Sequence, residues 1–277
     1  MTVVLIGFLL LQAPTPPTSP PAAMQSYAEG QAAYEKQENA AALAAFDRAI
    51  ALDAKNADFH HARCRTLARL QRHAEGIESC STALQLRPES APILIDRGHY
   101  YINVRKLDPA LADLTRVAAT KLEDYGLYYH LALALYMKGE FARAADAYVG
   151  CVRNAPNAEN RMSCQAWQYL ALVRAGRRDE AKALLDGFTP VPAATASAYG
   201  DRLLLFKGVK TEEEVASAMA KDGLQQATVG YGIGVWHLLN GRPQKAREYF
   251  EKALAPPAQL TGFGAVASYF ELERMKK

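Results

Sequence analysis

Few residues of this sequence have the types and the spacing that chemistry at a site requires. His60 and His61 are adjacent, and they lack the second-turn partner of an H-E-x-x-H zinc motif. The glycines from Gly230 to Gly234 alternate as in a phosphate-binding loop, but they lie inside a predicted helix and follow no strand. No motif places a nucleophile beside a base. The sequence therefore predicts a protein that is not an enzyme and that needs neither a metal nor a cofactor.

The elements that would position a binding site repeat every 34 residues. In one block, small Gly98 and Ala110 stand at positions 8 and 20, and Leu114 stands at position 24. Small residues let two helices of a pair approach closely, and the large residue fills the space between pairs. A single pair cannot bury its apolar face, so the pairs must stack. The register holds without an insertion over residues 23–56, 57–90, 91–124 and 125–158.

This pattern resembles the tetratricopeptide repeat (TPR), a helix pair of 34 residues. The resemblance implies an all-α fold, a right-handed α-solenoid of antiparallel helix pairs. After Ala158 the register slips by three residues and resumes as a fifth repeat. The chain is thus expected to divide into a signal-like segment with a Pro-rich linker, five repeats, a degenerate helix pair, and a sixth repeat with a capping helix. These parts cover residues 1–22, 23–188, 189–226 and 227–277.

Two features define the C-terminal part of this prediction. Thr211 and Glu214 form the sequence pattern of a capping box at a helix start. Residues 261–277 form a closing helix whose charged end suits a solvated cap, as the exposed end of a solenoid requires. Its inner face is expected to carry Phe263, Val266, Phe270 and Leu272. The charged, solvated residues are expected to be Glu271, Glu273, Arg274, Lys276 and Lys277.

The resemblance also bears on the four cysteines. Cys64 and Cys80 occupy positions 8 and 24 of one repeat, which face each other in a TPR hairpin. Cys151, at position 27, packs against the next helix, which carries Cys164. Two disulfides would each close a loop of about 15 residues, worth about 3 kcal/mol in the chain-entropy model. The alternative is four buried free thiols, and zinc is not expected because no C-x2-C occurs.

A candidate partner-binding surface follows from the same resemblance, because five positions of each first helix line the concave groove of TPR proteins. Here the N-terminal part of that groove is basic and aromatic, and the middle is apolar. The alternative is that Tyr129, Tyr136 and Trp167 pack between helices. The predicted groove residues are Tyr27, Gln31, Tyr34, His61, Arg65, Arg69, His99, Asn103, Tyr129, Leu133, Tyr136 and Arg174.

The amino terminus favours export. Val3 to Leu11 is an apolar run that is too short to span a membrane but fits the core of a secretory signal. Residues 12–21 are rich in Pro, Thr and Ser, which indicates a spacer. We therefore expect a periplasmic or secreted protein, with cleavage after Ala13 or Ala23. The alternative is a cytoplasmic protein, because no Lys or Arg precedes the apolar run.

The net charge and the lengths of the apolar stretches limit which partners the sequence can predict. The net charge of +3 is too balanced to predict a nucleic-acid partner, and no stretch is apolar for the length of a membrane span. The C-terminal third is similar in layout to the new-lipoprotein-I type of bacterial envelope TPR proteins, which scaffold cell-wall hydrolases and proteases. We therefore predict a scaffold that binds a protein or peptide partner in its concave groove. The alternative is a structural protein that forms homo-oligomers through its helical ends or convex face.

Overall fold

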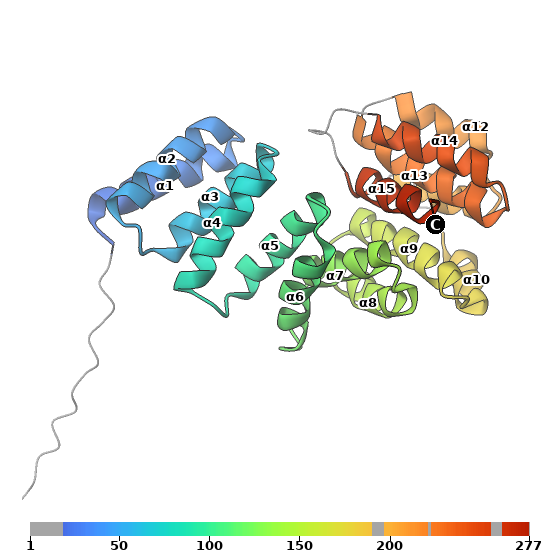
Figure 1. Ribbon diagram of the computed structural model, residues 1–277, viewed down its shortest axis with the longest axis horizontal. Helices are drawn as coiled ribbons and strands as arrows, with labels where there is room; N and C mark the ends of the chain where they lie inside the picture. Colours follow the sequence, from blue (N-terminus) through green and yellow to red (C-terminus); the bar gives the residue numbers. More distant parts are fainter. Residues whose placement is uncertain (1–18, 190–196, 221–222, 256–261, 277) are drawn as a thin grey trace, which may run out of the picture.

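The computed structural model describes residues 19–189, 197–220, 223–255 and 262–276, and every regular element in them is helical (Figure 1). The described residues form fifteen α-helices, of which α1 to α14 follow one another in pairs and α15 is single, so the predicted α-solenoid is confirmed. The first four pairs are α1 (Pro21–Glu35) and α2 (Asn39–Leu52), α3 (Ala57–Arg69) and α4 (His73–Leu86), α5 (Ala91–Asn103) and α6 (Leu107–Ala118), and α7 (Tyr125–Lys138) and α8 (Phe141–Asn154).

The C-terminal half continues the stack with less regular pairs. Its helices are α9 (Ala158–Arg174), α10 (Arg178–Gly187), α11 (Ala198–Phe206), α12 (Glu212–Ala216) with a 3-10 turn (Ser217–Ala220), α13 (Gly223–Leu239), α14 (Pro243–Leu254) and α15 (Phe263–Arg274). The capping box is confirmed, because the Glu214 amide donates to Thr211 Oγ1 and the Thr211 amide donates to Glu214 Oε2. Residues 1–18 of the signal-like segment lie outside the described residues, and helix α1 begins at Pro21, inside the predicted linker.

The turns inside the pairs preserve the 34-residue period in the backbone. Each contains a residue with positive φ, and in the first four pairs these are Gln37, Gln71, Arg105 and Gly139. The next is Gly176, 37 residues after Gly139, which reproduces the three-residue slip of the sequence. A residue with a side chain pays roughly 1–2 kcal/mol to adopt positive φ. Gly139 and Gly176 avoid this cost, whereas the first three turns, which have Gln or Arg at this position, do not.

Close helix contact holds each pair together. A Cβ added to Gly30 would lie 2.5 Å from the ring of Phe46, and one added to Gly98 would lie 2.7 Å from Leu114. Each glycine therefore admits the large side chain sixteen residues later, which is fully buried. The small and large residues of the pattern thus have the packing role that the sequence predicted.

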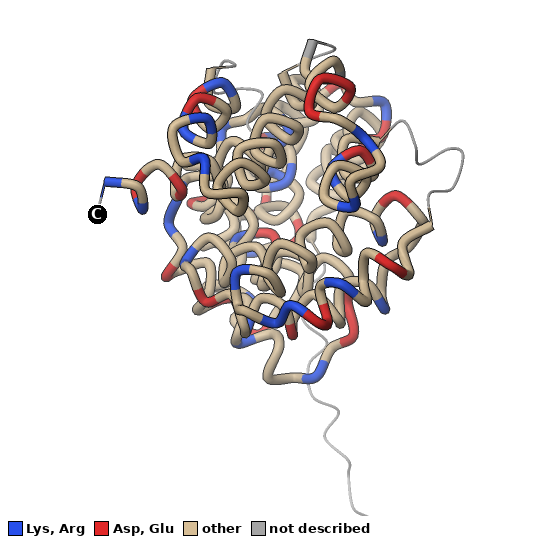
Figure 2. Tube along the Cα trace, turned by 90° about the vertical axis from the view of Figure 1, so that its right-hand side faces the viewer, with Lys and Arg blue, Asp and Glu red and all other residues tan. Residues whose placement is uncertain are grey.

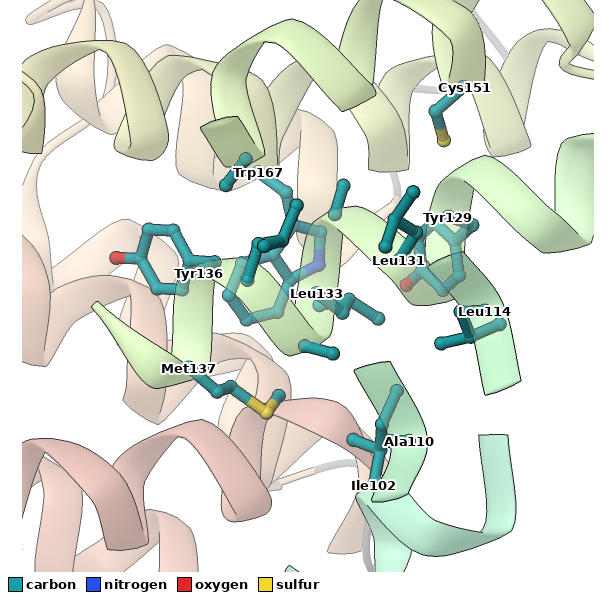
Figure 3. Packing of buried hydrophobic residues seen from close by; sticks show 14 of the residues in the cluster. Ile102, Ala110, Leu114, Tyr129, Leu131, Leu133, Tyr136, Met137, Cys151 and Trp167 are labelled. Carbon is teal, nitrogen blue, oxygen red and sulfur yellow. The ribbon is translucent and has the colours of Figure 1, made fainter. Parts of the chain in front are cut away.

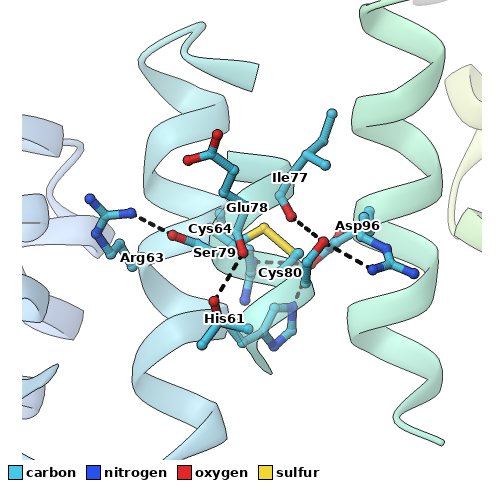
Figure 4. The surroundings of a disulfide bond; sticks show 12 residues. His61, Arg63, Cys64, Ile77, Glu78, Ser79, Cys80 and Asp96 are labelled. Carbon is cyan, nitrogen blue, oxygen red and sulfur yellow. Dashed lines mark hydrogen bonds and ion pairs between the residues drawn. A yellow bond between two sulfur atoms is a disulfide. The ribbon is translucent and has the colours of Figure 1, made fainter. Parts of the chain in front are cut away.

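Both expected cysteine pairs are joined in the structure. Cys64 and Cys80 connect α3 to α4 with their Cα atoms 5.4 Å apart, beside His61 (Figure 4). Cys151 and Cys164 connect α8 to α9 with a Cα separation of 5.9 Å. The first bond closes one helix pair and the second ties two consecutive pairs together. All four sulfur-bearing side chains are buried.

Helix α15 does not extend the stack as a solvated end cap. It packs on α13 and α14 and also reaches α5 and α7 (Figure 1). These two helices are the first members of the third and fourth pairs, which supply the concave face. The C-terminal helix therefore turns back into the curve of the solenoid.

Both disulfides can be tested on protein from its native cell. Peptides from a non-reduced digest should link Cys64 to Cys80 and Cys151 to Cys164. Reduction should lower the free energy of unfolding by about 3 kcal/mol per bond, because each bond restricts the unfolded chain. Urea unfolding with and without reductant measures this, and four free thiols in the native protein would contradict the pairing.

Candidate partner-binding groove

The N-terminal end of the concave face contains a pocket of about 310 Å³ between α1 and α3. Its walls include the rings of Tyr27 and Tyr34 and the side chains of His61 and Arg65. Tyr27 is held by Phe59, whose ring centroid lies 5.0 Å away. The rest of the lining is Gln31, Glu35, Phe46, Asp58 and Ala62.

A second pocket of about 380 Å³ continues this one toward the C-terminal half, since both are lined by Tyr34 and Arg65. Arg69, His99 and Asn103 line it from the helix pairs of the N-terminal half. Its far wall is formed by Tyr199, Leu224, Thr228, Gly262 and Phe263. We call the two pockets together the N-terminal groove. The structure thus brings eight of the predicted residues together: Tyr27, Gln31, Tyr34, His61, Arg65, Arg69, His99 and Asn103.

The two arginines of the groove are held in place without being fully neutralised. The guanidinium of Arg69 lies 3.4 Å from the ring centroid of Tyr34, and its Nη1 donates to the Tyr34 carbonyl. Arg65 lies 5.3 Å from the same ring and its side chain is 50% exposed. The carboxylate of Asp96 is 2.7 Å from His61 and 3.9 Å from Arg65. Arg65 therefore keeps free donor capacity toward the groove.

The middle of the predicted groove is buried and does not form part of the protein surface. Tyr129, Leu133 and Tyr136 are buried in the main hydrophobic core (Figure 3), so their prediction as accessible groove residues is wrong. The Tyr136 hydroxyl accepts a hydrogen bond of 2.8 Å from Tyr231 of α13. The cause is the return of the C-terminal helices, which cover this part of α7. The alternative, packing between helices, holds for these residues and for Trp167.

One carboxylate anchors α15 inside the curve. Glu271 is 1% exposed, and its Oε1 lies 2.9 Å from Arg174 and 3.0 Å from Arg274. Arg274 also donates to the carbonyls of Tyr136 and Met137 at the end of α7. Arg174 is thus part of an internal ion pair and not an open groove residue. The prediction of a solvated charged end is wrong for Glu271, because two arginines compensate its burial.

A histidine cluster forms the floor where the groove meets α15. The rings of His99 and His130 stack with centroids 4.3 Å apart, and the ring of Phe263 lies within 6 Å of both. Burial lowers the pKa of His130 to about 4 and holds the pKa of His99 well below its ordinary value. The cluster is therefore uncharged at neutral pH. Sequence reasoning found His99 but missed His130 and Phe263, since no rule within one repeat connects them to the groove.

Charges elsewhere are mixed. Figure 2 shows basic and acidic residues interspersed along the helices. Within the described ranges, no three His, Cys, Asp or Glu side chains are arranged to hold a metal ion. None of the described helices is long and apolar enough to cross a membrane.

Comparison with known proteins identifies the repeats. Residues 27–91 and 95–159 match the family model described as tetratricopeptide repeat. These two stretches, just under half of the chain, are similar to tetratricopeptide repeats. The matched residues belong to the first four helix pairs, and the new-lipoprotein-I layout of the C-terminal third stays a prediction. No curated protein sequence matches this chain.

Solved TPR structures have a similar fold. A crystal structure of MamA protein is 20% identical, with a TM-score of 0.54 over 62% of this chain and 98% of that one. A MamA structure from Desulfovibrio magneticus RS-1, residues 41 to the end, is 17% identical, with a TM-score of 0.56 over 61% of this chain and 94% of that one. At these identities the likeness concerns the fold alone.

The Glu271 anchor should be essential for docking of α15. Glu271→Ala leaves Arg174 and Arg274 without their counter-charge, so the free energy of unfolding should fall by about 3 kcal/mol. Glu273→Ala is the matched control, because Glu273 lies on the same helix and its side chain is 43% exposed. Its effect should stay below about 0.5 kcal/mol. Urea unfolding compares the two, and equal effects would contradict the anchor.

The histidine cluster should make stability depend on pH. Because the folded pKa of His130 is about 4 and its ordinary value is 6.5, the unfolded chain binds more protons between these values. Stability should therefore be full above pH 6.5 and fall by about 3 kcal/mol by pH 4 from this residue alone. His130→Phe should flatten that slope, and His60→Gln, outside the cluster, should not. The midpoint of urea unfolding, measured across this pH range, tests the prediction. If the midpoint of His130→Phe depended on pH as strongly as that of the parent protein, the pH dependence would not come from His130.

Proposed function

We propose that this protein is an interaction scaffold whose N-terminal groove holds an extended peptide segment of a partner protein. The main observation behind this proposal is that part of the concave face is filled by helices and part of it is open. Its middle and C-terminal parts are filled by α13 and α15, whereas two adjoining pockets remain open. The first lies between α1 and α3, and the second lies between the N-terminal helices and the wall formed by Tyr199, Leu224 and Phe263. The TPR fold supports an interaction role, and the open pockets point to the place.

The chemistry of the groove fits a peptide better than a helix. Tyr27 and Tyr34 offer aromatic surface for apolar side chains, which is typical of strong interface contacts. Arg65 and Arg69 supply donors for backbone carbonyls or an acidic side chain. Phe263 of α15 lies at the end of the groove, so a partner helix would have to share that space. An extended chain can pass along both pockets and place alternate side chains in them.

Two observations support a location outside the cytoplasm. The structure contains two disulfides, which persist in oxidising compartments. The apolar run from Val3 to Leu11 has the length of a signal core. We therefore propose an exported protein, in the periplasm if the source is a bacterium. Disulfide-linked peptides from the native protein would support this location, and four free thiols would contradict it.

Charge reversal in the groove should abolish partner capture. Arg65→Glu/Arg69→Glu removes two donors and introduces repulsion toward an acidic segment, so affinity should fall at least about tenfold. Arg116→Glu/Arg153→Glu is the matched control: it changes the net charge equally, on the second helices α6 and α8. A photo-reactive phenylalanine at position 34 should cross-link the partner segment, and mass spectrometry would identify its sequence.

The control also separates the alternatives. If Arg65→Glu/Arg69→Glu still captured the partner and the control did not, the partner would bind to the second helices instead of the groove. A protein that captures nothing but shows a multiple of its chain mass in solution would favour the self-associating structural role. Circular dichroism of each variant shows that loss of capture is not loss of fold.

A further inference from the structure

Arg202 on α11 is the one Lys or Arg side chain that is fully buried among the described residues. Its guanidinium carbon lies 4.9 Å from the ring centroid of Trp167, 5.4 Å from that of Tyr199 and 5.7 Å from that of Tyr231. Gly232 of α13 makes room for it, because a Cβ there would come within 2.5 Å of Arg202 Cγ. The side chain is thus enclosed by α9, α11 and α13.

No protein group in the described ranges neutralises this charge. The Nε, Nη1 and Nη2 atoms of Arg202 have no hydrogen-bond partner there. Each buried carboxylate in those ranges is engaged by another cation, Asp113 by Arg97, Asp201 by Lys210, and Glu271 by Arg174 and Arg274. A buried charge needs both a counter-charge and hydrogen bonds. Contacts with three aromatic rings compensate only part of that cost.

The same hydrophobic core contains a second buried donor without a partner among the described residues. The Tyr148 hydroxyl is buried and has no hydrogen-bond partner in the described part of the chain. Burial raises the pKa of this hydroxyl well above its ordinary value, and the positive charge of Arg202 acts on it in the opposite direction. A neutral hydroxyl and a guanidinium that both lack an acceptor are the groups that an anion requires.

We propose that Arg202 is the centre of a buried binding site for a small inorganic anion, with the Tyr148 hydroxyl as a second donor. The anion neutralises the guanidinium and completes its hydrogen bonds. It thereby fastens α11, the helix of the irregular segment, to α9 and α13. Tyr199 lies one turn from Arg202 on α11 and lines the N-terminal groove, so the site lies behind the groove wall. The site does not depend on the proposed peptide partner.

Trp167 offers a direct signal for this site. The chain has two tryptophans, so Trp236→Phe leaves Trp167 as the single fluorophore. The full-length protein is exchanged into sodium gluconate, whose anion is too large for an enclosed site. It is then titrated at constant ionic strength with sodium chloride and, separately, with sodium phosphate. The proposal predicts a saturable change of Trp167 emission with at least one of the two salts and none with further gluconate.

Three variants in the same background test the residues. Tyr148→Phe keeps the packing and removes one donor to a charged group, so the midpoint of the titration should rise about tenfold. Arg202→Met should abolish the saturable change, and Arg178→Met, which removes an exposed arginine, should not alter it. If Arg202→Met does not fold, Tyr148→Phe alone carries the test. A flat response of the parent, or an unaltered midpoint in Tyr148→Phe, would overturn the proposal.

Discussion

Four helix pairs of this chain, α1/α2, α3/α4, α5/α6 and α13/α14, are closed by a contact between two residues sixteen positions apart, and the stacking of the repeats depends on that contact. Gly30 with Phe46, Gly98 with Leu114, and Gly234 with Phe250 are such pairs. In the second repeat the same two positions hold the Cys64–Cys80 disulfide, so a covalent bond takes the place of the packing contact. Because these pairs are closed by local contacts, they can stack as units and present their first helices on one side.

This local rule explains what the sequence could predict. The helix pairs, their turns, the three-residue slip after Ala158 and both cysteine pairs depend on residues within one repeat or at the junction of two. Periodicity therefore found them. It also found eight of the residues that line the N-terminal groove, because these side chains follow from their positions on the first helices.

Long-range packing explains what the sequence could not predict. Glu271 meets Arg174 across 97 residues of sequence, and no repeat rule relates α15 to α7. A charged C-terminal helix is typical of a solvated cap, yet here its acidic residue is buried between two arginines. The docking of α15 places Phe263 on the histidine cluster, and Tyr231 of the neighbouring helix α13 donates a hydrogen bond to the buried Tyr136 hydroxyl. The misassigned groove residues Tyr129, Tyr136 and Arg174 all contact helices of the C-terminal half, so their misassignment shares one cause, the return of these helices.

The same docking defines the functional surface. By packing inside the curve, α13 and α15 leave a short groove whose arginines come from the second helix pair. Its aromatic rings come from the first and third pairs and, on the far wall, from Tyr199 and Phe263. The groove ends against α15 itself, so stability of the docked helix and shape of the groove are linked. Arg202, just behind that wall, is a further place where the C-terminal half requires a partner that protein groups do not supply.

Hydrogen–deuterium exchange of the intact chain tests this central claim most directly. The account predicts that backbone amides of α15, from Phe263 to Arg274, exchange as slowly as those of α13, because both helices are packed in the curve of the solenoid. Rapid exchange throughout α15 beside a protected α13 would contradict it. The C-terminal helix would then be a loose end, and the concave face would be open along its full length.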